Sequence, residues 1–195
     1  MLRSDIINHL IEKNDYKKYL EIGVRTPQQN INLIKIDHKD GVDPAGNCNY
    51  PMESDVFFEQ IGKDVKYDII FIDGLHLDYQ VDRDISNSFK HLSEGGVIVM
   101  HDCNPPTKQH QIEHYDGHSP WNGTVWKSYV KLRMSDENIH MYVVDTDWGV
   151  GILKRGKQEL FEYRDNLTFE FLDDNREKLL NLIPKEKFKK YDSSI

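Results

Sequence analysis

The 195-residue sequence contains only two cysteines, Cys48 and Cys103, which do not form a C-x-x-C pair. Two thiols are too few for a disulfide framework or a structural zinc site, so we expect both cysteines to be reduced. No stretch approaches the roughly 20 apolar residues that a membrane span requires, and the N-terminus lacks the apolar core of a signal peptide. These absences predict a cytoplasmic protein without a membrane partner.

An excess of basic residues is also missing. The chain has 25 Lys and Arg against 33 Asp and Glu, which gives a formal net charge of −8. Proteins that bind nucleic acids usually present a basic face, because neutralising phosphates supplies much of their affinity. We therefore expect no nucleic-acid partner. The hydrophobic fraction of 38% is ordinary for a globular protein, and the length suits one domain with a short appendage.

Apolar runs and apolar residues at helical spacing alternate along the chain. The run 68–73 is apolar without alternation, as in a strand whose two faces are both covered by helices. Thr26 and Pro27 are typical of a helix start, whereas Gly95 and Gly96 are expected to end a helix. The expected strands span residues 19–24, 41–43, 68–73, 97–100, 139–144 and 148–153, and the expected helices span residues 6–11, 28–36, 78–92 and 125–133.

This alternation predicts an α/β fold of the Rossmann-like kind, a mostly parallel sheet with helices on both faces. The late pair of strands is expected to place one antiparallel strand, the last one, at the edge of the sheet. We assign residues 1–157 to this domain and residues 158–195 to a C-terminal helical extension of the same domain, which is a candidate homodimer contact. Residues 104–121 are polar and rich in proline, glycine and histidine, which predicts a loop or lid.

The first two expected strands end in residues that suit a nucleoside. Ligands of open α/β sheets bind beyond the carboxyl ends of the strands, where Gly23 lets the backbone approach a ligand. Asp43 follows about 20 residues later, at a spacing where an acid can accept both hydroxyls of a ribose. The pattern predicts an adenosine cofactor. Because no further glycine occurs in residues 24–27, a pyrophosphate cradle, and with it NAD, is disfavoured.

The next two expected strands end in ionisable side chains. Asp73 and His76 follow one strand, and His101 and Asp102 follow the next. Since the carboxyl ends of parallel strands meet at one edge of the sheet, we expect these four side chains to lie together. The pKa of a histidine, near 6.5, suits removal of a proton from a hydroxyl group when a carboxylate or a metal assists.

Five segments together carry a resemblance to a known family: YLEIGV, GVDP, YDIIFIDGLH, LSEGGVIVMHDCNPP and VDTDWGVGIL. They are similar to class I S-adenosylmethionine-dependent methyltransferases. The nearest group is methyltransferase family 24, related to macrocin-type sugar O-methyltransferases and more distantly to catechol O-methyltransferase. The resemblance extends over residues 18–155. It implies that S-adenosylmethionine is the cofactor and that a hydroxyl of a small-molecule or saccharide acceptor is methylated.

The resemblance also implies which residues hold the cofactor. Glu21 and Gly23 would line its methionine part, Asp43 would hold its ribose, and Ser54 and Asp55 would lie near its adenine. Further implied contacts in the two turns beside these residues are Val24, Arg25, Asp73 and Gly74.

In metal-dependent relatives, an acid after the fourth strand and two ligands after the fifth hold a divalent cation such as Mg or Mn. Asp73, His101 and Asp102 occupy those places here. His101 departs from the usual oxygen ligand, and imidazole suits softer cations than Mg. Relatives carry a base three residues after the first acid, which corresponds to His76. The implied catalytic residues are therefore His76, Asp73 and Asp102.

The acceptor is expected to contact His76 and the end of the polar loop. Trp121 and Asn122 are the candidate acceptor contacts in that loop, because a tryptophan offers a flat apolar surface to a sugar ring.

Two other functions stay open at this point. A metal-dependent hydrolase would use the four side chains at the later strand ends, Asp73, His76, His101 and Asp102. It would turn over with a metal and no cofactor, and it would leave Asp43 without a role. A non-catalytic protein that binds an adenosine cofactor is suggested by the missing second glycine after Gly23. Such a protein would bind the cofactor without methyl transfer.

Overall fold

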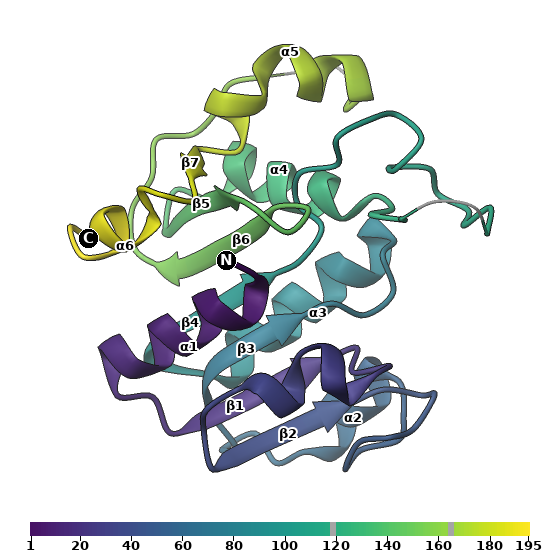
Figure 1. Cartoon of the computed structure of the whole chain (residues 1–195), viewed down its shortest axis with the longest axis vertical. Coiled ribbons are helices and arrows are strands. Elements are labelled where there is room, and N and C mark those ends of the chain that lie inside the picture. The colour runs from purple at the N-terminus through teal and green to yellow at the C-terminus, as the bar shows by residue number, and fades with distance from the viewer. Residues whose placement is uncertain (118–119, 164–165) are drawn as a thin grey trace.

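A seven-stranded sheet runs through the molecule in the order β2-β1-β3-β4-β6-β5-β7 (Figure 1). The computed structural model describes residues 1–117, 120–163 and 166–195. The strands are β1 (Lys18–Ile22), β2 (His38–Val42), β3 (Tyr67–Ile72), β4 (Leu92–Met100), β5 (Ile139–Asp145), β6 (Val150–Arg155) and β7 (Leu182–Pro184). The sequence pattern predicts all of these strands except β7. The mostly parallel α/β fold is confirmed.

The antiparallel strand does not lie where we expected it. β6 is antiparallel to both of its neighbours, β4 and β5, so it lies inside the sheet. The edge is formed by β7, which pairs in parallel with β5 and comes from the segment expected to be helical. A three-residue run that ends in Pro184 carries too little pattern to predict a strand. Proline also lacks the N–H that a central strand needs, which suits this edge position.

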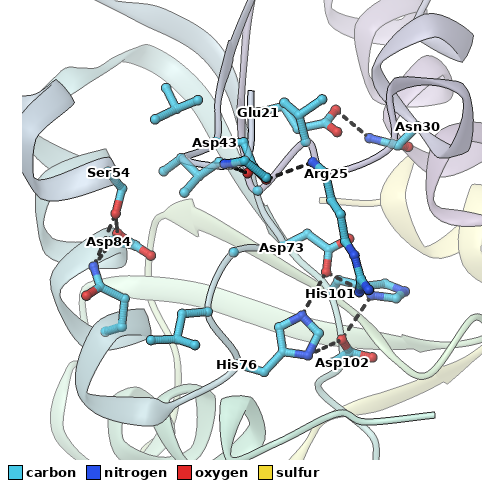
Figure 2. A pocket seen from close by; sticks show the side chains of 18 of the residues that line it. Glu21, Arg25, Asn30, Asp43, Ser54, Asp73, His76, Asp84, His101 and Asp102 are labelled. Atoms are coloured by element: carbon cyan, nitrogen blue, oxygen red, sulfur yellow. Dashed lines mark hydrogen bonds and ion pairs between the residues drawn. The ribbon is translucent and has the colours of Figure 1, made fainter. Parts of the chain in front are cut away.

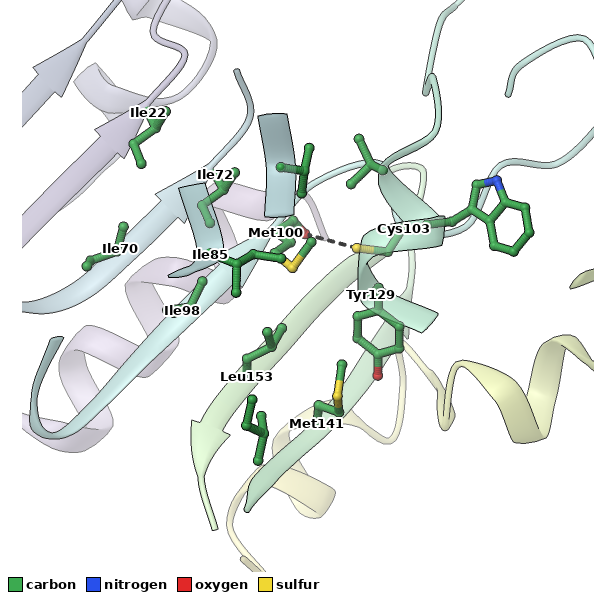
Figure 3. Close-up of a cluster of buried hydrophobic side chains, with 14 of the residues drawn as sticks. Ile22, Ile70, Ile72, Ile85, Ile98, Met100, Cys103, Tyr129, Met141 and Leu153 are labelled. Carbon is green, nitrogen blue, oxygen red and sulfur yellow. Dashed lines mark hydrogen bonds between the residues drawn. The ribbon is translucent and has the colours of Figure 1, made fainter. Parts of the chain in front are cut away.

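Helices cover both faces of the sheet, as predicted. The helices are α1 (Arg3–Asn14), α2 (Ser54–Gln60), α3 (Asp78–His91), α4 (Val125–Ser135), α5 (Phe169–Leu179) and α6 (Phe188–Asp192). Successive residues of a strand point to opposite faces. In β3, Ile70 and Ile72 belong to a buried cluster with side chains of α2, α3, α4 and α5. Figure 3 shows these two isoleucines with Ile85 of α3 and Tyr129 of α4. Ile69 and Phe71 belong to a second cluster, with side chains of α1 and α6.

Two local predictions were wrong. The helix expected over residues 28–36 is replaced by two short 3-10 helices, η1 (Pro27–Gln29) and η2 (Ile31–Leu33), and the Thr26 side chain makes no capping hydrogen bond. α3 ends at His91, before Gly95 and Gly96, and both glycines lie within β4. A Cβ at Gly96 would lie 2.8 Å from the carbonyl oxygen of Asp68. Close strand packing, and not a helix end, therefore accounts for this glycine.

The connection from β4 to α4 has no helix or strand in its described part, as the loop prediction required. Residues 118–119 of this connection lie outside the described residues, and its role as a lid stays a prediction. Within the described ranges, no helix is both long enough and apolar enough to cross a membrane.

The strand order reverses between β1 and β3. β1 pairs with β2 on one side and with β3 on the other, so the chain leaves β1 in one direction and later returns to its opposite side. Such a switch point opens a crevice at the carboxyl ends of the two strands, where ligands of α/β sheets bind. Gly23 and Asp73 stand at this point.

Candidate functional site

A cavity of about 890 Å³ opens at the carboxyl ends of the first four strands (Figure 2). All the residues predicted for the site line it with one exception: Glu21, Gly23, Val24, Arg25, Asp43, Ser54, Asp73, Gly74, His76, His101, Asp102, Trp121 and Asn122. The exception is Asp55, whose carboxylate pairs with Nε of Arg83 at 3.0 Å. Ser54 and Asp55 are consecutive residues of α2 and so point in different directions, and only Ser54 reaches the cavity.

Gly23 allows the turn after β1 to pass close to the backbone of Asp73 beneath the cavity. Its φ of +89° belongs to the left-handed region, and a Cβ there would lie 2.1 Å from the carbonyl oxygen of Asp73. The backbone of this turn is held by its neighbours, because Gly23 N donates to Val42 O at 2.8 Å and Asp73 N donates to Ile22 O at 2.8 Å. The floor of the cavity is therefore bare backbone, as the sequence indicated.

Asp43 lies at the end of β2 and is 8% exposed. Its Oδ2 accepts the backbone N–H of Arg25 at 2.7 Å, and its Oδ1 accepts that of Ala45 at 2.7 Å. A carboxylate has about four acceptor sites, so the side chain is fixed in place and can still accept hydroxyl groups. This arrangement suits the role predicted for an acid that holds a ribose.

Glu21 is buried at the other side of the turn, with 1% exposure. Its Oε2 accepts a hydrogen bond from Asn30 Nδ2 at 2.8 Å (Figure 2). The same oxygen accepts a hydrogen bond from Tyr19 Oη at 2.5 Å. Burial raises the pKa of Glu21 to about 7, against the opposing effect of these two donors. Oδ1 of Asn30 is buried without a hydrogen-bond partner, although Asn30 lines the cavity. Two acceptors are thus available here for a cationic group.

The third region of the cavity lies between α2 and α3. Ser54 Oγ donates to Asp84 Oδ1 at 2.6 Å, and Gln80 Nε2 donates to the same oxygen at 3.1 Å. Asp84 is 1% exposed, and burial raises its pKa to about 6, against the opposing effects of Ser54 and Gln80. Sequence reasoning missed Asp84, but a signal existed: it falls on the inward face of α3 with Val81 and Ile85.

The ends of β3 and β4 bring an imidazole and two carboxylates together (Figure 2). His76 Nε2 lies 3.3 Å from Asp73 Oδ1, and His76 Nδ1 lies 3.2 Å from Asp102 Oδ2. Asp102 has a φ of +60°, an uncommon backbone conformation for a residue other than glycine. Such strained conformations cluster at functional sites. The clustering predicted from the strand ends is present.

His101 belongs to this group but also contacts a cation. Its Nδ1 lies 3.2 Å from both Asp73 Oδ1 and Asp102 Oδ2, and its Nε2 lies 3.1 Å from Nη1 of Arg3. Among the described histidines, cysteines and acids, one group could hold a metal ion. It consists of Asp73, His76 and Asp102, whose donor atoms lie within 4.8 Å of one another. His76 therefore also lies close enough to share an ion with the two carboxylates, and the role of His101 as a ligand stays a prediction.

Burial and charge act against each other in this cluster. Burial alone would raise the pKa of Asp73, but the His101 and His76 imidazoles outweigh it and hold that pKa well below its usual range. Burial alone would lower the pKa of His76, but Asp73 and Asp102 raise it. The same two carboxylates raise the pKa of the buried His101. The ionised forms of acids and imidazoles thus stabilise one another.

The polar loop contributes the wall next to His76. Its Trp121 carbonyl oxygen accepts a hydrogen bond from His76 Nδ1 at 2.8 Å. Asn122 is buried, and its Nδ2 donates to Asp102 Oδ1. Gly123 allows this approach, because a Cβ there would lie 2.0 Å from the carbonyl oxygen of His76. Both predicted acceptor contacts therefore lie beside the cluster.

An acid that suits a ribose, a turn of bare backbone and an acid–imidazole cluster lie on one Rossmann-like sheet, as a transferase with a nucleoside cofactor would require. The sequence comparison narrows this class. Residues 24–103 match the model of methyltransferase family 24, which is described as a methyltransferase domain. The match extends from the turn after β1 to the residue after Asp102 and confirms the resemblance seen in the sequence. Residues 24–103 of the chain are therefore similar to a methyltransferase domain. A comparison with curated proteins finds no match.

Solved structures share this fold. One is the methyltransferase PaMTH1 of Podospora anserina with S-adenosylhomocysteine bound, which is 15% identical, with a TM-score of 0.54 over 80% of this chain and 78% of that chain. Another is the O-methyltransferase TomG of Streptomyces achromogenes in complex with S-adenosylmethionine, which is 9% identical, with a TM-score of 0.51 over 79% of each chain. At these identities the likeness establishes the fold.

Proposed function

We propose that this chain is an S-adenosylmethionine-dependent O-methyltransferase whose acceptor is a hydroxyl of a small molecule, with saccharides as the favoured acceptor class. One observation carries the proposal. A single cavity holds acids suited to a nucleoside at one end and His76, between Asp73 and Asp102, at the other. The saccharide preference is supported by the family resemblance and by the Trp121 ring beside His76.

The size of the cavity and the residues that line it support this cofactor. Its volume of about 890 Å³ lies within the roughly 300–1,000 Å³ of small-molecule sites. The bare turn at Gly23 would pass beneath the cofactor, Asp43 would hold the ribose hydroxyls, and Ser54 would lie beside the adenine. Glu21 and the unpaired Oδ1 of Asn30 would accept the ammonium group of the methionine part.

When bound, S-adenosylmethionine supplies an electrophilic methyl group on its sulfonium sulfur. His76 then acts on the acceptor hydroxyl. Its Nδ1 proton is held by the Trp121 carbonyl oxygen, which leaves Nε2 to take the hydroxyl proton. Asp73 and Asp102 stabilise the imidazolium that results. The walls of the cavity orient the acceptor, and such positioning supplies a large part of the rate enhancement in bimolecular reactions.

The same cluster fits a divalent cation. The carboxylates of Asp73 and Asp102 offer the oxygen ligands that Mg and Mn prefer. One nitrogen cannot both bind a cation and take a proton, so we assign the cation to the two carboxylates and leave Nε2 of His76 as the base. The cation would lower the pKa of the acceptor hydroxyl.

We also propose that residues 1–157 and 158–195 form one domain, because β7 extends the same sheet. The free thiols of Cys48 and Cys103 support a cytoplasmic location. The homodimer contact in the C-terminal extension remains a prediction.

Calorimetric titration with S-adenosylhomocysteine tests the cofactor. Release of S-adenosylhomocysteine from S-adenosylmethionine, measured with a panel of methyl glycosides and phenols with and without Mn²⁺, tests the transfer. We expect binding in the micromolar range and turnover of at least one acceptor. Absence of binding at millimolar ligand would refute the proposal. Binding without turnover of any acceptor would favour the non-catalytic alternative, and cofactor-free hydrolysis with Mn²⁺ would favour the hydrolase.

A further inference from the structure

Arg3 reaches the cavity from the first turn of α1 and is fixed there by Asp147. Its backbone N–H donates to Asp147 Oδ2 at 2.8 Å, and its Nη1 donates to the same oxygen at 3.2 Å. Asp147 has a φ of +47°, so its backbone adopts a strained conformation in the turn between β5 and β6. The guanidinium group is therefore held in one position before any ligand enters.

Part of this guanidinium group has no hydrogen-bond partner. Nη1 contacts Asp147 and His101, whereas Nε is buried without a hydrogen bond and forms an ion pair with Asp73 Oδ2 at 3.8 Å. Within the described parts of the chain, Nη2 has no hydrogen-bond partner either. Nε and Nη2 form one edge of the planar group, and such an edge binds a carboxylate through two parallel hydrogen bonds.

The charges around this edge indicate the ligand. Arg3 and Glu21 both line the cavity, and the guanidinium group of Arg3 acts to lower the pKa of Glu21. Glu21 and Asn30 present acceptors there, whereas Arg3 presents donors. A cation and an anion side by side complement an α-amino acid, whose ammonium and carboxylate groups are attached to one carbon.

We propose that Arg3 binds the carboxylate of the methionine tail of S-adenosylmethionine, opposite the ammonium site at Glu21 and Asn30. This inference rests on the proposed function. The other two arginines of the cavity are less suited to the role. Arg25 has an exposed side chain without an ion pair among the described residues, and Arg83 pairs with Asp55 at 3.0 Å on the adenine side.

Two ligands that differ only in the tail test the proposal. S-adenosylhomocysteine carries the amino-acid tail, whereas 5′-methylthioadenosine has the same nucleoside and a thioether without it. We expect Arg3→Gln to raise the Kd of S-adenosylhomocysteine about 10- to 100-fold, the range for a hydrogen bond between charged groups. The Kd of 5′-methylthioadenosine should change less than about twofold, since the lost contact is absent from that complex.

Arg83→Gln is the matched control, because it removes the same charge at the adenine end. We expect it to change both Kd values by the same factor. Arg3→Lys keeps the positive charge but lacks the edge with two parallel N–H donors. Its selective loss of affinity for S-adenosylhomocysteine should be smaller than that of Arg3→Gln. It also serves as the test variant if circular dichroism shows that Arg3→Gln is unfolded.

Three results would overturn the assignment of Arg3. They are equal losses for the two ligands in Arg3→Gln, no loss for S-adenosylhomocysteine, or equal affinities of the unmodified protein for both ligands. The last result would leave the nucleoside site, and so the proposed cofactor, intact. Failure of the unmodified protein to bind either ligand would instead remove the proposed function together with this inference.

Discussion

Trp121 holds the His76 imidazole in two ways at once. The Trp121 carbonyl oxygen accepts the hydrogen bond from Nδ1 at 2.8 Å, and the indole ring stacks on the imidazole with a centroid distance of 5.1 Å and an interplanar angle of 24°. The hydrogen bond fixes the proton on Nδ1, and the stacking fixes the plane of the ring. Nε2, which lies 3.3 Å from Asp73 Oδ1, is thereby left as the nitrogen that exchanges a proton with the acceptor.

Replacement of His76 should abolish proton removal but not cofactor binding. We expect His76→Gln to lower kcat about 10²- to 10⁴-fold, the usual contribution of a general base. The Kd of S-adenosylhomocysteine should change little, because the imidazole acts on the acceptor. His38→Gln is the matched control: His38 is exposed on β2, and its loss should leave kcat unchanged. Full turnover by His76→Gln would remove the base assignment and leave the cofactor site unaffected.

The two contacts of Trp121 can be separated, because every substitution keeps the backbone carbonyl. We expect Trp121→Ala to lower kcat/KM about 3- to 10-fold, since an aromatic pair is worth about 0.5–1.5 kcal/mol. Trp121→Phe keeps a ring over His76 and should stay within about twofold of the unmodified enzyme. Steady-state kinetics with the acceptor found in the screen measures both. Equal losses in the two variants would assign the loss to the hydrogen bond that the Trp121 indole Nε1 donates to the Ile112 carbonyl oxygen, and not to the stacked ring.

The parts of the fold that follow from local patterns were predictable from the sequence. The apolar run of β3 indicated a strand with helices packed on both of its faces. The three-residue interval from Asp73 to His76 placed both side chains at one strand end. β7 was missed because three residues carry no periodicity. Gly95 and Gly96 were misread as a helix end because a glycine needed for strand packing looks the same in the sequence as one that ends a helix.

The rest of the site depends on contacts between distant segments. Arg3 and Asp147 are 144 positions apart, and His76 and Trp121 are 45 apart. No periodicity or spacing links such pairs, so only the tertiary structure shows that they meet. Asp84 is different, because a single acid on the apolar face of a predicted helix is a visible signal of a buried polar site.

The turn at Gly23 allows the cost of a steric clash to be separated from the cost of a strained backbone. Gly23 and Gly46 have nearly the same φ, +89° and +88°, but a Cβ at Gly46 meets nothing within 4 Å. We expect Gly46→Ala to cost about 1–2 kcal/mol, the penalty of a left-handed backbone. Gly23→Ala adds a clash with the Asp73 carbonyl and should cost about 4 kcal/mol or more. Urea unfolding compares the two, and equal costs would show that the turn relaxes around the added methyl group.

The buried carboxyl of Glu21 should make stability depend on pH. Its pKa is raised from 4.5 to about 7 in the folded chain. The folded state therefore binds the proton more tightly than the unfolded state. Between pH 4.5 and pH 7 the free energy of unfolding falls as the pH rises, by about 3 kcal/mol at most, and above pH 7 this loss is complete.

Glu21→Gln removes this ionisable group and keeps the size of the side chain. We expect the variant to be more stable than the unmodified protein at pH 8, by about 1–3 kcal/mol, and to lose most of that advantage at pH 5. Urea unfolding at both pH values measures the difference. An advantage of the same size at pH 5 and pH 8 would mean that the titration of Glu21 is not its source. The same variant should bind S-adenosylhomocysteine about 10-fold more weakly or worse at pH 8, because the ammonium group loses its carboxylate partner. A gain in stability together with a loss of affinity would show that the protein keeps this buried charge for its ligand.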